Sequence, residues 1–359
     1  MTVNDFLPSV YEKQVTSGSV TWRSPSNIAL VKYWGKHGQQ LPMNPSVSFT
    51  LSECATTTKL SWQPKDSEGF SFDLFFEGEK KIAFYGKIEK FLERVQPYLG
   101  FLEDFHFKIE TSNSFPHSSG IASSASGMSA LSLALMSLEE ELTGVIDKRE
   151  FKRKASFLSR LGSGSACRSI DGPLIEWGEH VTIPGSSDLF GVPYPHPVAE
   201  VFTTYRDVIL LVDKGVKKVS STVGHNLMSG HPYAEARFDQ ARNNMDLLQT
   251  IFQSGDLSAF TALVESEALS LHAVMLASTP SYILMKPNTL QVIEKVWEYR
   301  KETGSALCFT LDAGANVHLL FPDEENDRVM EFIKSDLVGY CQNGQYICDG
   351  VGKGAEMLK

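Results

Sequence analysis

The order of apolar patterns in the second half of the chain most constrains its fold. A short apolar run indicates a buried strand, and three long stretches after it repeat apolar residues at the spacing of amphipathic helices. Two strand patterns, another helix and a final strand follow. In order, these segments cover residues 208–212, 234–252, 257–272, 290–300, 306–311, 317–321, 329–333 and 345–348. This order predicts an α+β fold in which an antiparallel sheet is layered with helices.

The first half of the chain predicts a sheet with its own helices. The predicted strands cover residues 19–32, 46–62, 70–76, 105–110 and 173–177, and the predicted helices cover 84–95, 149–159 and a segment that begins near 124. Because 359 residues exceed the usual size of one hydrophobic core, two domains are expected. The segment 184–197, rich in Pro, Gly and Ser, is the predicted linker. We therefore expect domains at 1–190 and 191–359.

Charge and cysteine content exclude several classes of protein. A formal charge of −10 without a long block of Lys or Arg argues against a general nucleic-acid or membrane surface, so any phosphate binding must be local. The five cysteines form no C-x-x-C pair, which predicts free thiols rather than a disulfide or zinc framework. The sequence has no uniformly apolar 18-residue run and no apolar signal-peptide centre, so a cytoplasmic protein is expected.

The segment 113–127, Asn-Ser-Phe-Pro-His-Ser-Ser-Gly-Ile-Ala-Ser-Ser-Ala-Ser-Gly, joins a predicted strand to a predicted helix. Glycine lets the backbone approach a ligand, and a helix N-terminus offers free amides and partial positive charge. The segment therefore predicts a phosphate-binding loop, with an ordinary Ser-capped loop as the alternative. No Walker A sequence is present, and Cys167 stands where a dinucleotide loop that starts at Gly162-Ser163-Gly164 needs its third glycine.

Two other segments place cations among small or polar residues. Arg168 lies in Gly-Ser-Gly-Ser-Ala-Cys-Arg-Ser, residues 162–169, where a guanidinium would offer paired donors to a carboxylate or phosphate. Lys32 and Lys36 flank Tyr-Trp-Gly after a predicted strand, a spacing that suits separated phosphate oxygens. The alternatives are a structural salt bridge for Arg168 and solvent-facing lysines.

Asp312 follows an apolar strand and precedes Ala-Gly, so its carboxylate fits either a general base or an ordinary turn. His37, His117 and His272 are too scattered to predict a metal triad. The absence of Gly-x-Ser-x-Gly disfavours a serine hydrolase. The segments that remain point to an enzyme that acts on a small polyanion.

Together these segments resemble the diphosphomevalonate decarboxylases of the GHMP kinase superfamily in order and spacing. The phosphate loop is similar to that of GHMP kinases in general, whereas Lys-Tyr-Trp-Gly-Lys at 32–36 and the 162–169 segment resemble the decarboxylase branch. Residues 220–224, 271–273 and 312–316 extend the resemblance over most of the chain. It implies a two-domain, GHMP kinase-like α+β fold with antiparallel or mixed sheets and an active site in the cleft between the domains.

The resemblance also implies an activity and a set of site residues. The activity is the ATP- and Mg²⁺-dependent conversion of mevalonate 5-diphosphate into isopentenyl diphosphate, ADP, phosphate and carbon dioxide. Asp312 would orient or deprotonate the 3-hydroxyl, Arg168 would hold the substrate carboxylate, and Lys32 would be the third catalytic residue. The implied substrate-binding residues are Tyr33, Lys36, Ser163, Ser165, Arg168 and Ala313. The implied ATP-binding residues are Asn113, Ser118, Gly120, Ser123, Ser124, Ser126 and Ser221.

The chain departs from the family pattern near the expected substrate site. Ala315 stands where Pro is usual, Asp171 and Pro173 change the segment after Arg168, and Lys353 stands where Ser is more usual. These departures bear on substrate choice rather than on reaction class. The alternatives are therefore a mevalonate-monophosphate decarboxylase, a mevalonate 3-kinase and, in a different class, a non-catalytic ligand-binding homologue. The resemblance also implies a homodimer, and binding to nucleic acid or membrane is not expected.

Overall fold

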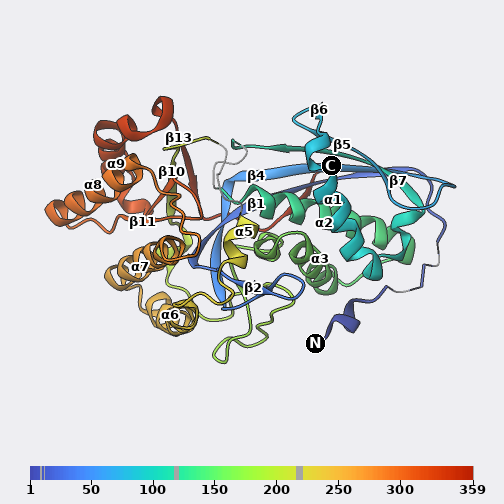
Figure 1. Ribbon diagram of the computed structural model, residues 1–359, viewed down its shortest axis with the longest axis horizontal. Helices are drawn as coiled ribbons and strands as arrows, with labels where there is room; N and C mark the ends of the chain where they lie inside the picture. The colour runs from blue at the N-terminus through green and yellow to red at the C-terminus, as the bar shows by residue number, and fades with distance from the viewer. Residues whose placement is uncertain (9, 12, 117–120, 216–220, 359) are drawn as a thin grey trace.

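The computed structural model describes residues 1–359 except 9, 12, 117–120, 216–220 and 359. Within the described residues, the strands form one eight-stranded, one four-stranded and one two-stranded sheet. Figure 1 shows the large sheet with α1, α2 and α3 on the right, and the four-stranded sheet with α8 and α9 on the left. The α+β class is confirmed.

The large sheet is built around two long strands, β1 and β4. Its path is β14-β1-β4-β7-β5-β6, and β8 pairs with both β4 and β9. Its strands are β1 (Gly18–Val31), β4 (Ser46–Pro64), β5 (Ser71–Phe76), β6 (Glu79–Lys80), β7 (Phe105–Asn113), β8 (Leu174–Trp177), β9 (Val192–Pro193) and β14 (Glu356–Leu358). Because β5 pairs with β7 in parallel while the other pairs are antiparallel, this sheet is mixed.

Two details of this sheet differ from the sequence-based prediction. The chain does not end with the strand near 345–348, because β14 returns to pair with residues 21–23 of β1. This edge strand has three exposed residues and therefore leaves no burial pattern in the sequence. The predicted linker 184–197 is anchored rather than free, since Phe190 is buried and Tyr194 N donates to Leu174 O.

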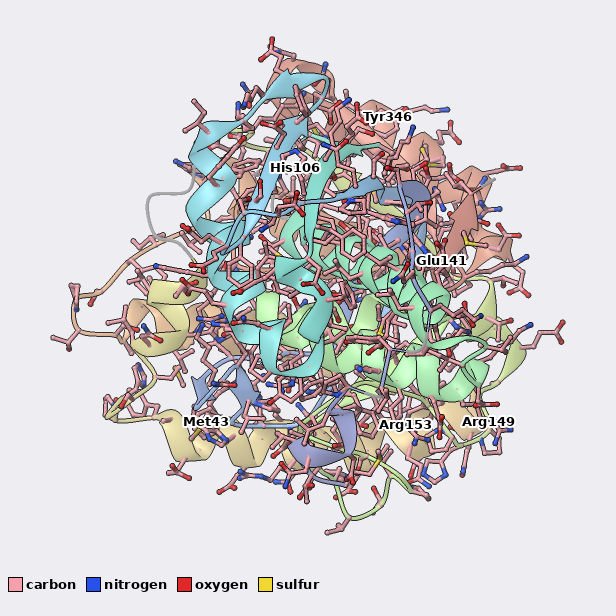
Figure 2. The ribbon with its side chains drawn as sticks, turned by 90° about the vertical axis from the view of Figure 1, so that its right-hand side faces the viewer. Met43, His106, Glu141, Arg149, Arg153 and Tyr346 are labelled. Atoms are coloured by element: carbon pink, nitrogen blue, oxygen red, sulfur yellow. The ribbon has the colours of Figure 1, made fainter. Side chains whose placement is uncertain are left out.

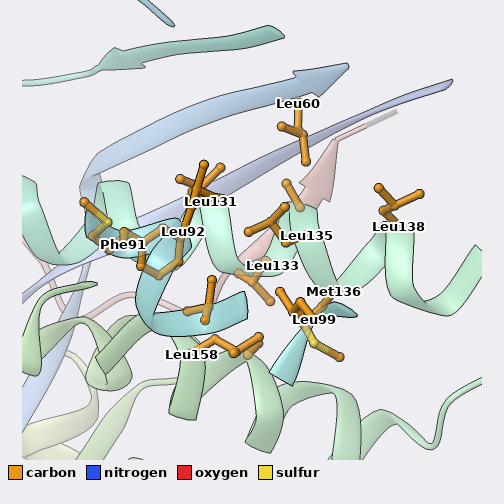
Figure 3. Close-up of a cluster of buried hydrophobic side chains, with 14 of the residues drawn as sticks. Leu60, Phe91, Leu92, Leu99, Leu131, Leu133, Leu135, Met136, Leu138 and Leu158 are labelled. Atoms are coloured by element: carbon orange, nitrogen blue, oxygen red, sulfur yellow. The ribbon is translucent and has the colours of Figure 1, made fainter. Parts of the chain in front are cut away.

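Three helices cover the large sheet: α1 (Tyr85–Val95), α2 (Ser123–Thr143) and α3 (Lys148–Gly162). α1 buries one face through Ile88, Phe91, Leu92 and Val95. α2 packs on β1, β4 and α3 and is buried on nearly all sides, so it lacks a polar face; Figure 3 shows Leu131, Leu133 and Leu135 of α2 in this core. Figure 2 shows Glu141 and Arg149 on the outside of this layer.

The second sheet has the order β11-β12-β10-β13. Its strands are β10 (Arg206–Leu210), β11 (Cys308–Thr310), β12 (Val317–Phe321) and β13 (Tyr346–Gly350). The helices of this half are α4 (Glu200–Thr203), α5 (Ser221–Asn226), α6 (Ala234–Ser254), α7 (Leu257–Leu276), α8 (Pro287–Thr303) and α9 (Asn326–Phe332). The predicted antiparallel pairing and the three long helices are confirmed.

The two halves share a buried interior. One core cluster joins Ile28 and Phe49 of the large sheet to Phe252, Phe260 and Cys308 of the second half. The division of the chain into domains at 1–190 and 191–359 stays a prediction.

α7 meets the length and composition of a membrane-spanning helix, alone among the helices in the described part of the chain. However, 61% of its apolar window is buried inside the fold, as in a core helix. All five cysteines lie among the described residues and are free, which confirms the predicted thiols.

Candidate active site

A cleft of about 500 Å³ lies where the end of β1, the start of α2, the 3-10 helix η5 (Gly164–Ser169), α5 and the turn after β11 meet. The sequence-predicted residues that line it are Lys32, Tyr33, Lys36, Ser123, Ser124, Ser163, Ser165, Arg168, Ser221, Asp312 and Ala313. The two halves of the chain both contribute to this cleft.

A larger cavity of about 940 Å³ lies between β4, β13 and α9. Its Asp349 accepts from the backbone amides of Ser52, Glu53 and Cys54 and so serves to join the two sheets. Its Arg206 is paired with Asp323. The smaller cleft is the candidate active site, because its charged groups converge on the cavity.

Lys32 and Asp312 form the central pair of the cleft. Lys32 follows the last residue of β1, and its Nζ lies 3.1 Å from Oδ1 of Asp312. The lysine side chain is 2% exposed and the aspartate 24%, so the ammonium is sealed in while the carboxylate still reaches the cleft. Burial lowers the pKa of Lys32, and the charges of Asp312 and Glu267 oppose that shift. His272 Nε2 donates to the backbone oxygen of Asp312 at 3.1 Å and supports the turn.

Arg168 is a buried cation with unused donors. It is 3% exposed, donates to Ser46 Oγ and lies over the Trp177 ring, 5.8 Å from its centroid. Among the described residues, its Nε has no hydrogen-bond partner and its guanidinium forms no salt bridge. Because a buried guanidinium is costly without an anion, this arrangement favours an anionic ligand over the structural salt bridge considered from the sequence.

Glu176 of β8 is a buried carboxyl group close enough to Arg168 to be affected by its charge, but the two side chains form no hydrogen bond or salt bridge. It is fully buried, and both of its oxygens lack partners among the described residues. Burial raises its pKa well above the ordinary value, with only partial opposition from Arg168. This environment favours the neutral, protonated form of Glu176 in the folded protein.

Replacing Glu176 with glutamine should raise the free energy of unfolding at pH 7. The folded chain holds this proton more tightly than the unfolded chain, which loses it above pH ~4.3, so rising pH favours unfolding until the folded carboxyl group also ionises. Thermal melts should show a gain of a few degrees at pH 7 that disappears near pH 4. Glu265→Gln is the matched control, because both oxygens of buried Glu265 accept from Arg300, at 2.6 and 3.0 Å, so this variant should give no gain. An unchanged or lower Tm for Glu176→Gln at pH 7 would contradict the neutral acid.

The turn that carries Tyr33 and Lys36 is fixed from two sides. Tyr33 packs on Trp177 and His225, with ring centroids 4.6 and 4.3 Å apart, and Gly164 is required beside it because a Cβ there would lie 2.8 Å from the Tyr33 hydroxyl. Gly35 adopts φ +94° and donates to His225 Nδ1 at 3.0 Å. Burial lowers the pKa of His225 to about 3, which leaves its imidazole neutral.

Lys36 is half-buried and donates to Gln40 Oε1 at 2.7 Å, across the β2 (Lys36–His37) and β3 (Leu41–Pro42) hairpin. Its pKa is lowered by burial and by Arg94. Lys32 and Lys36 thus have different environments: Lys32 is buried against Asp312, whereas Lys36 lies at the side of the cleft. Neither is the simple solvent-facing lysine considered from the sequence.

The start of α2 corrects the predicted Ser cap. The cap position is Ala122, in the left-handed region with φ 42°, and it makes no side-chain capping hydrogen bond. Ser124 instead accepts from Lys87 Nζ at 2.8 Å. Since no side chain in the described part of the chain caps α2, its N-terminal amides remain suited to an anion.

Two of the residues expected to bind ATP lie around rather than in this cleft. Asn113 and Ser126 are linked through Thr56, whose Oγ1 lies 2.8 Å from Asn113 Oδ1 and 2.6 Å from Ser126 Oγ. Ser126 is fully buried, and Asn113 lines a neighbouring cavity. Ser118 and Gly120 lie outside the described residues. Lys87, Gln40 and His225 line the cleft but were not predicted, since a lone Lys, Gln or His in its local sequence has no distinguishing pattern.

Comparison with known families gives the same assignment for both halves of the chain. A model described as the diphosphomevalonate decarboxylase-like N-terminal domain matches residues 24–188, and a model of the mevalonate 5-diphosphate decarboxylase C-terminal domain matches residues 207–353. The chain belongs to the diphosphomevalonate decarboxylase family. The resemblance noted from its motifs is thereby confirmed.

Relatives of the family match along most of their length. The chain is 27% identical over 333 residues to a diphosphomevalonate decarboxylase of Aspergillus fumigatus, covering 88% of this chain and 80% of the relative. It is 26% identical over 309 residues to a phosphomevalonate decarboxylase of Haloferax volcanii, covering 85% of this chain and 88% of the relative.

Solved structures of the family superpose on the whole fold. Mevalonate diphosphate decarboxylase from Staphylococcus aureus is 27% identical, with a TM-score of 0.82 over 96% of this chain and 99% of the other. Another structure, from Enterococcus faecalis, is 26% identical with a TM-score of 0.81 over 96% and 100% of the two chains, and its described subject is mevalonate diphosphate-mediated ATP binding. This member of the family therefore has the two-domain architecture of a decarboxylating enzyme.

Proposed function

We propose that this enzyme converts mevalonate 5-diphosphate and ATP into isopentenyl diphosphate, ADP, phosphate and carbon dioxide. The observation that carries the proposal is one cleft that holds a buried Arg168 without a salt-bridge partner among the described residues and a Lys32–Asp312 pair. This substrate requires two groups of the enzyme in addition to the ATP site. A guanidinium binds the substrate carboxylate, and a carboxylate accepts the proton of the substrate hydroxyl.

In the proposed first step, the Asp312 carboxylate accepts the proton of the substrate 3-hydroxyl. The resulting oxygen attacks the γ-phosphorus of ATP, and ADP leaves with the electron pair of the broken P–O bond. Lys32 lies 3.1 Å from Asp312, so its ammonium stabilises the carboxylate and the negative charge that develops nearby. Phosphoryl transfer of this kind depends mainly on positioning and on charge neutralisation.

In the second step, the C–O bond to the new phosphate and the C–C bond to the carboxylate break. The electron pair of the C–C bond forms the double bond of isopentenyl diphosphate, and phosphate takes the pair of the C–O bond. Arg168 would hold the carboxylate in line for this elimination, with Ser163, Ser165 and Ala313 beside it. Tyr33 and Lys36 would contact the diphosphate.

The N-terminus of α2, with Ser123 and Ser124, is the proposed site of the ATP phosphates, and Ser221 of α5 faces it across the cleft. Asn113 and Ser126 would support this loop through Thr56, and we retain Ser118 and Gly120 as proposed ATP contacts. An apolar cavity of about 160 Å³ beside Lys87 is suited to the nucleoside base.

Magnesium fits this site as an ion carried by the nucleotide. In the described ranges, no group of three or more His, Cys, Asp or Glu side chains is placed to hold a metal. Phosphate oxygens and water would then supply most of its ligands, as is usual for this ion. It would neutralise charge on the phosphates when bound.

Lys87→Met should weaken ATP binding because Lys87 Nζ lies 2.8 Å from Ser124 Oγ at the proposed phosphate site. We expect KM for ATP to rise about tenfold, the effect of losing one charge-assisted hydrogen bond, while KM for the diphosphate substrate changes little. Steady-state kinetics with each substrate varied in turn will measure both values. Lys90→Met, on the exposed side of the same helix, is the control. An unchanged KM for ATP in Lys87→Met would remove Lys87 from the nucleotide site.

The decisive experiment offers the purified enzyme Mg²⁺-ATP with mevalonate, its 5-phosphate or its 5-diphosphate, and follows ADP and carbon dioxide. Release of both products from the diphosphate supports the proposal. Preference for the monophosphate would assign the activity named for the Haloferax volcanii relative. ADP without carbon dioxide indicates a 3-kinase, and no product from any substrate indicates a non-catalytic homologue.

We further propose that the enzyme works in the cytoplasm as a homodimer. Free thiols at all five cysteines support a reducing compartment. Light scattering after size-exclusion chromatography will give the mass of the assembly, for which the single chain is 39.8 kDa.

A further inference from the structure

A buried ion pair from the second half of the chain lies directly behind Lys32. Arg237 of α6 and Glu267 of α7 are 3% and 0% exposed. Arg237 donates to both carboxylate oxygens of Glu267, at 3.1 Å from Nη1 and through a shorter contact from Nη2. Asn244 Nδ2 also donates to Glu267, at 2.6 Å. Two side chains of α6, Arg237 and Asn244, thus hold the Glu267 carboxylate in one position.

This pair reaches the backbone of Lys32. Lys32 N donates to Glu267 Oε2 at 2.8 Å, and Lys32 O accepts from Asn44 Nδ2 at 2.9 Å and from Arg237 Nη2 at 3.4 Å. β1 ends at Val31, so these side chains take the place of sheet partners for the next peptide. The Lys32 peptide is therefore held by side chains of α6 and α7 and by Asn44, and not by a neighbouring strand.

The ion pair has no evident value for stability alone. A fully buried pair often stabilises a fold no better than apolar residues of the same volume would, because both charges lose their hydration. Its geometric effect is specific, since one Glu267 oxygen is shared between Arg237 and the peptide that carries the active-site lysine. Glu267 therefore fixes the backbone position from which the Lys32 side chain extends.

We propose that Glu267, held by Arg237, is a positioning residue that fixes Lys32 against Asp312 for phosphoryl transfer. This inference rests on the proposed function, in which the Lys32–Asp312 pair at 3.1 Å prepares the carboxylate that takes the hydroxyl proton. It assigns a role to the contact between α6, α7 and the end of β1. Glu267 itself does not line the cleft.

Glu267 also acts on the charge of Lys32. The described charged groups that act on this ammonium are Asp312, Glu267, Arg168 and Asp207, while Arg237 contacts the backbone oxygen of Lys32. Burial and Arg168 lower the pKa of Lys32, whereas Asp312 and Glu267 raise it. Loss of the Glu267 charge should therefore let Lys32 lose its proton at a lower pH, and the alkaline limb of the kcat–pH profile should move in the same direction.

The test compares Glu267→Gln with Glu265→Gln in the same helix. Glu265 is a buried carboxylate that accepts from Arg300 at 2.6 and 3.0 Å and from Trp297, on the side of α7 that faces α8. Both variants thus lose the charge of a buried glutamate that is paired with an arginine, although Arg300 is 26% exposed. Glu267→Gln should lower kcat by about 10–10²-fold with both KM values within about threefold, since a small misplacement of catalytic groups has effects of this size. Glu265→Gln should keep kcat within about twofold, the scale of a change remote from the site.

The outcomes separate the inference from the proposed function. If wild-type enzyme releases no carbon dioxide from the diphosphate, the proposed function fails. If wild type is active but Glu267→Gln matches Glu265→Gln in kcat, or leaves the alkaline limb unmoved, the positioning role is wrong. If Glu267→Gln does not fold by circular dichroism, Arg237→Lys takes its place, because it keeps the charge but loses the bidentate contact. That variant should also lower kcat with little change in KM, and an unchanged kcat would overturn the role.

Discussion

Asp312→Asn should lower kcat for carbon dioxide release by about 10²–10⁴-fold, the range for loss of a general base. The asparagine side chain has nearly the same shape and can still accept from Lys32 Nζ, which lies 3.1 Å from the carboxylate. What it loses is the charge that receives the hydroxyl proton. Because the proposed site of the ATP phosphates is formed by the start of α2 and does not include Asp312, ATP affinity should stay within about threefold, and titration calorimetry with a nonhydrolysable ATP analogue will measure it.

Asp213→Asn is a matched control for this variant. Asp213 is 33% exposed, close to the 24% of Asp312, and pairs with Lys286 at 3.2 Å, but this pair lies outside the cleft and its lysine is 46% exposed. Its replacement should leave kcat close to wild type. If Asp312→Asn keeps wild-type turnover, Asp312 is a turn residue and another group takes the proton.

Arg168→Gln should lower kcat/KM for the diphosphate substrate by about 10²–10³-fold, because truncation of one partner in a buried charge pair costs about 2–5 kcal/mol. In the proposed complex, the substrate carboxylate would be left without its cation in a pocket walled by Trp177. KM for this substrate should rise and kcat should fall, since the elimination step needs the carboxylate in line. KM for ATP should change little.

Arg160→Gln controls for the loss of a buried arginine. Arg160 is 1% exposed and donates to the backbone oxygens of Leu189 and Gln39, outside the cleft. It should lower Tm, because both backbone oxygens lose their donor, but without the loss in kcat/KM. Equal kinetic losses in the two variants would mean that Arg168 acts through the fold and does not contact the substrate.

The elements of this fold that are long and periodic are those the sequence predicts well. α6 and α7 bury residues at the spacing of a helix, so local pattern is enough to place them. β1 and β4 have long stretches buried on both faces, so their length and not strict alternation identifies them. β14 escapes prediction because its partners are residues 21–23, far away in the chain, and its own residues are exposed. The missing Ser cap at α2 escapes for a related reason, since Ser124 is engaged by Lys87 from another helix.

The candidate site also contains residues that the sequence predicts and residues that it does not. Motifs place Lys32, Arg168 and Asp312 in chemically suitable surroundings, and the structure brings all three to one cleft. Lys87, His225 and Glu267 carry no motif, yet each contacts a segment that does. Their contribution depends on pairs of residues between 37 and 235 positions apart in the chain.

The sequence by itself determined the α+β class, the family and the main charged residues of the site, because these follow from local spacing and from contiguous motifs. Only the tertiary structure decided that Lys32 is sealed against Asp312, that Arg168 lacks a salt bridge among the described residues, and that Glu267 holds the Lys32 peptide. Burial and charge pairing are properties of neighbours in space. They become defined when β1, η5, α7 and the turn at Asp312 meet in the folded chain.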